Sequence, residues 1–488
     1  MPRSKDKQRT WSALFDHVQK ALGSPPDLIC RLVGVKEEQS VQCMYLESMV
    51  DKKTLDDYVL KSLMAGTFSE VKHPDAAADG FFRELPLSLK LDELAKQTTD
   101  ALLAGQCVLV DTDRERLYTI DMAAPQQRQV SEPKSESIIR GPHEGFTESI
   151  DTNVGLIRKR IRNPFLRIEK LSIGRQTRTT VLLIYLKNLA PERLVEEARR
   201  RLSAIETDSV LESAYIEEYI QDRILTPFPT LTNTERPDVA SAHLLDGKVA
   251  IMIDGTPNML LAPVTFLEFF SSPEDYYQRA DIATFLRWIR LISFFTAVFV
   301  PSLFVAATTF HQELIPAQLL ISLSAQREGV PFQAFVEVLM MEVVFEIIRE
   351  AGLRMPRAVG QALSIVGAIV LGQAAVDAGL ISAAVVIVVA ITGITNFVVP
   401  VYSFGMSQRL VRFSFILLAG TMGLFGILCG SLFLAAHLVS LKSFGVPYLT
   451  SVAPANIADW QDELFRAPRP WMNGSRLPGF INLLKRRK

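Results

Sequence analysis

Five charged residues interrupt an apolar, helix-like stretch between Pro331 and Gly352. Glu342, Glu346 and Arg349 follow one another at spacings of four and three, so they share one face of a helix. Charged side chains inside a membrane must face protein or water, and rings of acidic residues attract cations. The stretch therefore has two interpretations. Either Glu342 and Glu346 line a cation pathway, or a charge network that includes Arg349 and Glu350 holds helices together.

A second group of polar residues lies in the segment 361–376, between apolar side chains. Gln361, Ser364 and Gln373 are unusual for a helix that faces lipid, and Gly372 leaves room beside them. Small residues let helices approach closely, whereas polar ones can line a narrow aqueous pore. We therefore add Gln361, Ser364 and Gln373 to the candidate ion pathway and keep close helix packing as the alternative.

The elements that must position these residues are apolar helices. A membrane-spanning helix needs about 20 apolar residues. The sequence offers apolar runs at 291–310, 361–376, 381–401 and 413–441, of which 361–376 is shorter than this length. The first follows Arg287, Trp288 and Arg290, which resemble an interface anchor. The last run is too long for one upright helix and too short for two full ones, so a tilted, kinked or re-entrant helix is expected. These runs, with the charged stretch, predict four to six spans.

The positive-inside rule orients the spans. If the front half lies in the cytosol, the loops that carry Arg354, Arg357, Arg409 and Arg412 also fall on the cytosolic side. The basic tail agrees only if the run 413–441 doubles back. We expect a cytosolic front half and a cytosolic tail.

The front half contains a repeated pattern. Residues 31–63 and 170–202 both read as strand, polar turn, strand and helix, and Met44-Tyr45-Leu46 corresponds to Ile184-Tyr185-Leu186. A helix and a β-hairpin follow in each case. The predicted fold class is an α+β soluble N-terminal half, made of two related α/β subdomains, followed by an α-helical multi-pass membrane domain.

The predicted organisation follows from these patterns. An N-terminal amphipathic segment precedes the first subdomain, and a polar linker joins the two subdomains. A transmembrane domain and a basic C-terminal tail follow. The boundaries are 1–24 for the segment, 25–130 and 145–280 for the subdomains, 131–144 for the linker, 281–442 for the transmembrane domain and 443–488 for the tail.

Several classes of function find no support in the sequence. The formal net charge is -1, which gives no reason to expect nucleic-acid binding. The cysteines and histidines have no metal-ligand spacing, and no P-loop, dinucleotide fingerprint or nucleophile elbow is present. We expect no enzyme activity, no catalytic residue, no metal and no cofactor.

One basic run in the second subdomain has two interpretations. Arg158, Lys159, Arg160 and Arg162 precede Pro164, where a helix must stop. They form either a contact for anionic lipid headgroups or an acidic partner, or a solvated helix end.

Long strings from residue 140 to 455 resemble one family. The string GPHEGFTESIDTNVGLIRKRIRNPFLRIEKLSIGR is similar to the signature of the A subunit of GerA-type spore germinant receptors. Further similar strings are TPFPT (226–230), TERPD (234–238), LLDGKVAIMIDGTP (244–257), SPEDYYQR (272–279), HQELIPAQLLISLSAQREGVPF (311–332) and SFGVPYLTSVAP (443–454). Thr230 departs from the usual PFPQ. The family also includes a stage V sporulation paralogue, which these strings do not separate from the receptor subunits.

The resemblance implies a location and partners. It implies a multi-pass protein of the inner membrane of the bacterial endospore, with the front half on the core side. The implied partners are a permease-like B subunit, a lipoprotein C subunit, membrane lipid and further copies of the same chain. A subunits of this family are thought to form an oligomeric, nutrient-gated ion channel. The alternative function is a membrane-anchored scaffold or signalling subunit without its own conduction pathway.

Overall fold

The structure is a computed structural model. It describes residues 3–34, 40–61, 82–85, 91–111, 116–123, 133, 136, 138, 140–354, 372–450, 452, 460, 462–468 and 470. The chain divides into two compact units. The α/β unit is Met1–Gln221, Asn233–Pro263 and Ser475–Lys488, and the helical unit is Asp222–Thr232 and Val264–Gly474.

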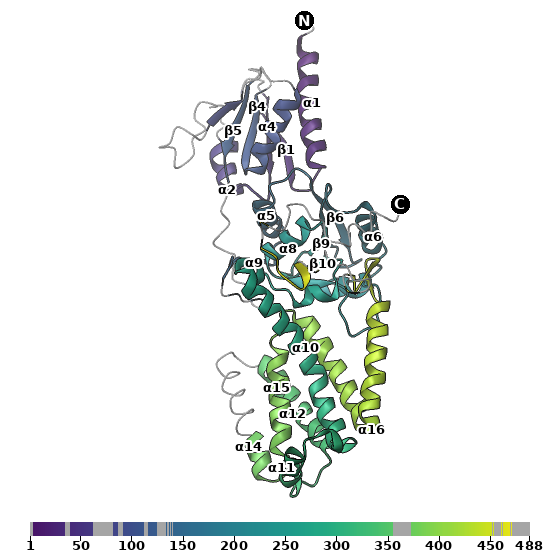
Figure 1. The fold of residues 1–488 in the computed structure, drawn as a ribbon. Helices are drawn as coiled ribbons and strands as arrows, with labels where there is room; N and C mark the ends of the chain where they lie inside the picture. The colour runs from purple at the N-terminus through teal and green to yellow at the C-terminus, as the bar shows by residue number, and fades with distance from the viewer. Residues whose placement is uncertain are drawn as a thin grey trace. The chain divides into compact units, whose positions relative to one another are not determined.

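The α/β unit begins with a five-stranded antiparallel sheet of strand order β1-β2-β4-β5-β3 (Figure 1). Apolar side chains of α1, among them Leu14 and Val18, pack with Leu102 of α4 against one face of the sheet. Leu55 and Val59 of η1 cover the other face. The bounds are α1 (Arg3–Leu22), β1 (Leu28–Gly34), β2 (Ser40–Leu46), α2 (Lys52–Thr54), η1 (Leu55–Leu60), β3 (Phe82–Leu85), α4 (Leu91–Leu103), β4 (Gln106–Asp111) and β5 (Arg116–Asp121).

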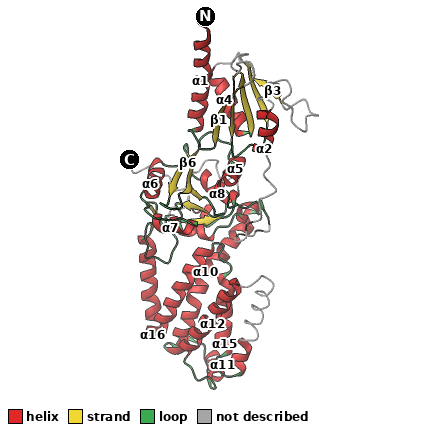
Figure 2. Ribbon diagram, turned by 180° about the vertical axis from the view of Figure 1, so that it is seen from behind, coloured by secondary structure: helices red, strands yellow, loops and turns green. Residues whose placement is uncertain are grey.

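A second sheet in the same unit has the order β6-β7-β9-β10-β8. Ile157 of α5 and Leu244 of α8 pack on one face of it, against Ile184 and other strand residues. Figure 2 shows the helices beside the strands of this sheet. The bounds are α5 (Ile150–Arg160), β6 (Leu166–Ile173), β7 (Thr179–Leu186), α6 (Glu192–Ser203), α7 (Ser213–Ile220), β8 (Thr232–Thr234), α8 (Pro237–Leu245), β9 (Val249–Ile253) and β10 (Met259–Ala262).

The two sheets are equivalent in strand order and in register. Leu28 faces Leu46 in the first hairpin, and Leu166 faces Leu186 in the second. The next pairing also corresponds, because Met44 faces Val108 and Ile184 faces Ala250. The repeat in the sequence is therefore also a repeat of topology.

In the described part of the helical unit there are four longer helices with short elements between them. The longer ones are α10 (Ala280–Thr309), α12 (Ala334–Arg354), α15 (Ala383–Asn396) and α16 (Tyr402–Ser440). The short ones are η3 (Phe266–Phe270), α9 (Glu274–Tyr277), η4 (Gln312–Leu314), α11 (Ala317–Arg327), α14 (Gly372–Asp377), β11 (Lys442–Ser443) and β12 (Val446–Pro447). We call the end of this unit at which α10 begins the proximal end, and the end near Thr309 the distal end. The elements α11 and α14 lie at the distal end (Figure 1).

The helix α16 is a hairpin of two arms. Its backbone leaves the helical region at Gly423, with φ 61° and ψ −141°. A positive φ favours glycine, and a Cβ here would lie 2.9 Å from a ring carbon of His311. Gly426 and Gly430 of the second arm lie against Leu418 of the first, so the glycine series closes the hairpin. The long apolar run thus doubles back and returns to the proximal end.

Two helices of the described part of the chain are long and apolar enough to cross a bilayer, namely α10 and α16. The apolar helix α15 is shorter. The expected four to six spans therefore stay a prediction.

Candidate functional site

Three carboxylates of α12 lie inside the helical unit. Glu337 and Glu342 are buried, and the Glu346 side chain is 34% exposed. The helix forms here because its long apolar runs pack on α10, α15 and α16. Glu342 and Glu346 contact α16, and Glu337 contacts Arg327 of α11 and the start of α15, so α12 connects several elements of this unit.

Glu342 forms a buried ion pair with Arg412 of α16. The Nη2 and Oε2 atoms are 3.0 Å apart, and both side chains are 1% exposed. Among the described residues, neither carboxylate oxygen has a partner with hydrogen-bond geometry, and the same holds for the guanidinium nitrogens. The charges therefore compensate each other by contact, while their hydrogen-bonding capacity is unused, which is costly in an apolar interior.

Glu346 lies one turn further along α12 and binds two arginines. Arg409 of α16 donates from Nη1 to Glu346 Oε1 at 2.7 Å, and Arg349 contacts the same oxygen. The spacing of three between Arg409 and Arg412 matches the spacing of four between Glu342 and Glu346, because α12 and the first arm of α16 run antiparallel.

Glu337 joins the distal elements. Its Oε2 accepts hydrogen bonds from the Ser382 amide at 2.9 Å and from the Ser382 hydroxyl at 2.8 Å, so it caps the start of α15. Its Oε1 lies 3.3 Å from Nε of Arg327, at the end of α11. Glu337 therefore links α12 to α11 and to α15 at the distal end of the unit.

The other predicted residues that the structure describes have their partners outside this group. Gln361 and Ser364 lie outside the described residues. Gln373 is exposed on α14 and donates to Asp377 at 2.9 Å. Glu350 pairs with Arg354 on the exposed side of α12, at 2.7 Å.

Two arginines that the sequence analysis placed in a cytosolic loop are in fact part of α16. Arg409 and Arg412 are buried, and they neutralise Glu346 and Glu342. The expectation was wrong because periodicity assigns an arginine before an apolar run to the flanking loop. The spacing of the two arginines on α16 complements the spacing of the two acids on α12. This signal can be read only when α12 and α16 are known to be neighbours.

The basic run of α5 is also corrected in part. Arg158 is 1% exposed and donates two hydrogen bonds to Asp27, from Nε at 2.7 Å and from Nη2 at 2.8 Å. The Ser48 hydroxyl donates to the same carboxylate at 2.6 Å. Arg158 therefore connects the two halves of the α/β unit and does not contact lipid.

The other three basic residues of this run are at least partly exposed. Lys159 and Arg160 each lie 2.7 Å from Glu144, and Arg162 is exposed. Lipid or partner contact stays a prediction for Lys159, Arg160 and Arg162.

Several of the family-like strings meet at the proximal end of the helical unit. The strings 226–230 and 443–454 contribute Phe228 and Tyr448 to an aromatic cluster, in which Phe269 stacks on Phe404 with ring centroids 4.7 Å apart. Hydroxyl groups satisfy the carbonyls of the loop 222–232, since Tyr448 donates to Pro229 O at 2.9 Å and Ser443 to Thr230 O at 2.5 Å. The cluster consists of Phe228, Phe266, Phe269, Phe270, Phe294, Phe404 and Tyr448.

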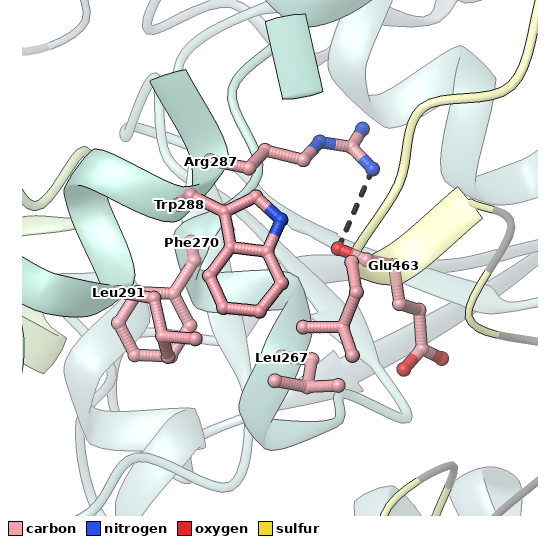
Figure 3. A pocket seen from close by; sticks show the side chains of 7 residues that line it. Leu267, Phe270, Arg287, Trp288, Leu291 and Glu463 are labelled. Atoms are coloured by element: carbon pink, nitrogen blue, oxygen red, sulfur yellow. Dashed lines mark hydrogen bonds between the residues drawn. The ribbon is translucent and has the colours of Figure 1, made fainter. Parts of the chain in front are cut away.

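A small, mostly apolar pocket lies beside the start of α10 (Figure 3). Arg287 borders it and approaches the Glu463 carbonyl at 3.5 Å. Arg287 and Arg290 both contact the buried carboxylate of Asp275, at 3.0 and 2.8 Å. These arginines are therefore structural and do not serve as the lipid-facing anchor that their position before the span predicts.

The architecture and the site together define a class of protein. A repeated α/β unit precedes a helical unit in which two of the described helices are long and apolar enough to cross a bilayer, which points to a membrane-associated protein. The sequence profile described as "Bacillus/Clostridium GerA spore germination protein" matches residues 16–477. The chain belongs to this family of spore germination proteins and is of the A-subunit type.

Similar proteins cover nearly the whole chain. Spore germination protein KA of Bacillus subtilis (strain 168) is 42% identical over 95% of this chain and 85% of its own length. Spore germination protein GerLA of Bacillus cereus is 40% identical over 93% of each chain. A crystal structure of the N-terminal domain of the A subunit of the Bacillus megaterium spore germinant receptor GerK3 is 32% identical. The match covers 52% of this chain and 94% of that one, with a TM-score of 0.38.

Proposed function

We propose that this chain is the A-type membrane subunit of a nutrient germinant receptor, and that copies of it form a nutrient-gated ion channel. The channel releases ions early in germination, and the chain acts without enzyme chemistry. The observation that carries the proposal is the set of carboxylates that α12 places inside an otherwise apolar helical unit. Acidic side chains at membrane depth are costly, and they are characteristic of ion pathways.

The pairing of these acids corresponds to a closed channel. Arg412 neutralises Glu342, and Arg409 with Arg349 neutralises Glu346, so neither acid is free to attract a cation. A displacement of α16 relative to α12 separates both pairs at once, because both arginines lie on the same arm of α16. Opening is then a sliding or tilting of two helices, with the acids exposed to water.

We propose six crossings of the bilayer. Four are α10, α12 and the two arms of α16, and α15 is a fifth, shorter one. The sixth is the segment 361–376, which the sequence predicts as a span and of which all but the last residues lie outside the described part of the chain. An even number of crossings returns the chain to the side from which it entered, which agrees with a cytosolic front half and a cytosolic tail on the core side of the spore inner membrane.

The proposed partners are a permease-like B subunit, a lipoprotein C subunit, membrane lipid and further copies of this chain. Spore germination proteins KA and GerLA match over 95% and 93% of this chain, and their names favour a receptor subunit over the stage V sporulation paralogue. Receptor subunits act together, so the nutrient signal reaches α12 through contacts with other chains.

A second candidate is a membrane-anchored scaffold or signalling subunit without its own pathway. The observation that favours it is that each buried acid of α12 has an arginine partner, as expected of a network that only stabilises the helices. The two candidates differ in what neutral substitutions do to ion release.

The test is ion release from spores after nutrient addition. We expect Glu342→Gln with Glu346→Gln to slow potassium release strongly at normal amounts of the protein, and Glu342→Asp to retain most of it. Glu350→Gln is the matched control, because Glu350 lies on the exposed side of the same helix. Unchanged release in the double variant contradicts the pathway and favours the scaffold.

A further inference from the structure

The loop between Asp222 and Thr232 carries two fully exposed apolar side chains at its tip. Ile224 is 77% exposed and Leu225 is 88% exposed. Two adjacent large aliphatic side chains in water are unfavourable, because their apolar surface stays exposed to water. An exposed apolar group of this kind, when it adjoins other apolar surface, commonly marks a contact with a membrane or with a partner.

The tip has a fixed position in the helical unit. On one side of it, Arg223 donates from Nη1 to the Ser440 hydroxyl at 3.2 Å. On the other side, the Thr226 hydroxyl lies 2.9 Å from Nε2 of His437. Both partners belong to the last turn of α16. The tip is therefore held at the level where the second arm of α16 ends.

That level is the boundary of the bilayer if α16 crosses it. The second arm exposes Phe433 and Val439 on its surface, and Phe433 is 75% exposed. Ile224 and Leu225 lie at the end of this apolar surface, and their side chains add to it. Continuity with the lipid-facing surface is the reason to assign the tip to lipid and not to water.

The charges beside the tip fit the same assignment. Arg223 and Lys442 are both exposed at this end of α16. The nearby acid Asp222 accepts a hydrogen bond from the Phe444 amide at 2.6 Å, which directs its charge to the backbone. Apolar side chains flanked by cations are the pattern of segments that bind anionic lipid surfaces.

We infer that Ile224 and Leu225 insert into the proximal leaflet of the membrane, while Arg223 and Lys442 contact its phosphate groups. This inference depends on the proposed membrane-spanning function. It assigns a lipid-binding role to the loop 222–232, which is part of the helical unit although the residues on either side of it in sequence belong to the α/β unit. The loop then adds a lipid contact to the helical unit at a point separate from the first span.

The test uses spin labels on the full chain in vesicles of phosphatidylglycerol and phosphatidylethanolamine. The exposed Cys30 and Cys429 are first replaced by Ser and Ala, and a nitroxide is attached at Leu225→Cys. Labels at Phe433→Cys and at the exposed Lys53 position, Lys53→Cys, serve as lipid and water controls. Collision of each label with oxygen and with a water-soluble nickel chelate is measured.

The expected result is that the Leu225 label collides with oxygen in preference to the chelate, as the Phe433 label does. A label accessible to the chelate, like the one at Lys53, overturns the inference. A label shielded from both reagents also overturns it and assigns the tip to a protein partner. If Phe433→Cys itself is accessible to the chelate, the membrane-spanning function fails, and the inference fails with it. Ile224→Cys repeats the test if Leu225→Cys does not fold.

Discussion

Replacing Glu342 with glutamine leaves the positive charge of Arg412 buried without its counter-charge. The two side chains are each 1% exposed and their closest charged atoms are 3.0 Å apart. Loss of one partner of a buried pair costs about 3–5 kcal/mol, because the remaining charge keeps its desolvation penalty. For a unit of this size, that is a fall in melting temperature of about 6–20 °C.

The assay is thermal unfolding of the purified chain in detergent, followed for a double-mutant cycle. Glu342→Gln and Arg412→Met are each expected to lower the melting temperature within that range. The combined variant is expected to recover most of the loss, because replacing both charges removes the unpaired group together with the pair. The matched control Glu350→Gln breaks an exposed pair on the same helix and is expected to cost less than about 1 kcal/mol.

Two results would refute this reasoning. One is a Glu342→Gln variant as stable as Glu350→Gln, which means that water or an ion already compensates Arg412. The other is a double variant no more stable than the worse single variant, which means that the two charges do not depend on each other.

Three further predictions concern other parts of the chain. Asp27→Asn leaves the buried Arg158 guanidinium without its carboxylate and should lower the unfolding free energy of the α/β unit by about 2–5 kcal/mol, measured by chemical denaturation. Gly423→Ala forces a side chain into a positive φ beside His311 and should cost about 1–3 kcal/mol, whereas Gly405→Ala, in open space on the same helix, should be neutral or stabilising. Burial raises the pKa of Glu136 to about 7 against the opposing hydrogen bond from Thr234, so its stabilising contribution is full below about pH 4.5 and is lost as the pH rises through 7. Glu136→Gln should therefore remove about 3 kcal/mol of pH dependence from thermal unfolding between pH 4.5 and 8, and an unchanged pH profile would contradict it.

The repeat in the front half could be predicted because it depends on local patterns. The strings around Met44 and Ile184 carry the same alternation of strand and turn, and the strand register follows from it. The hairpin in α16 could also be predicted in part, since the run 413–441 is too long for one upright helix. The position of its turn at Gly423 depends on contacts with Phe310 and His311, which no local pattern contains.

The pairs Asp27–Arg158 and Glu342–Arg412 could not be predicted, because each joins residues far apart in the sequence. Asp27 and Arg158 belong to different halves of the α/β unit. The four basic residues at and after the end of α5 resemble a solvated helix end, and the sequence does not indicate which of them is buried. Glu342 could be identified as a buried candidate from its own helix. Its partner Arg412 could not, since that assignment requires the pairing of α12 with α16.

The central claim is that the acids of α12 belong to an ion pathway that the arginines of α16 close. The most direct measurement is the nutrient-triggered current across a planar bilayer that contains this chain and its receptor partners, recorded under a potassium chloride gradient. The account predicts a cation-selective reversal potential that moves toward zero in the variant carrying Glu342→Gln and Glu346→Gln, while Glu350→Gln leaves it unchanged. A current with the same reversal potential in all three proteins, or no nutrient-triggered current at all, would contradict it.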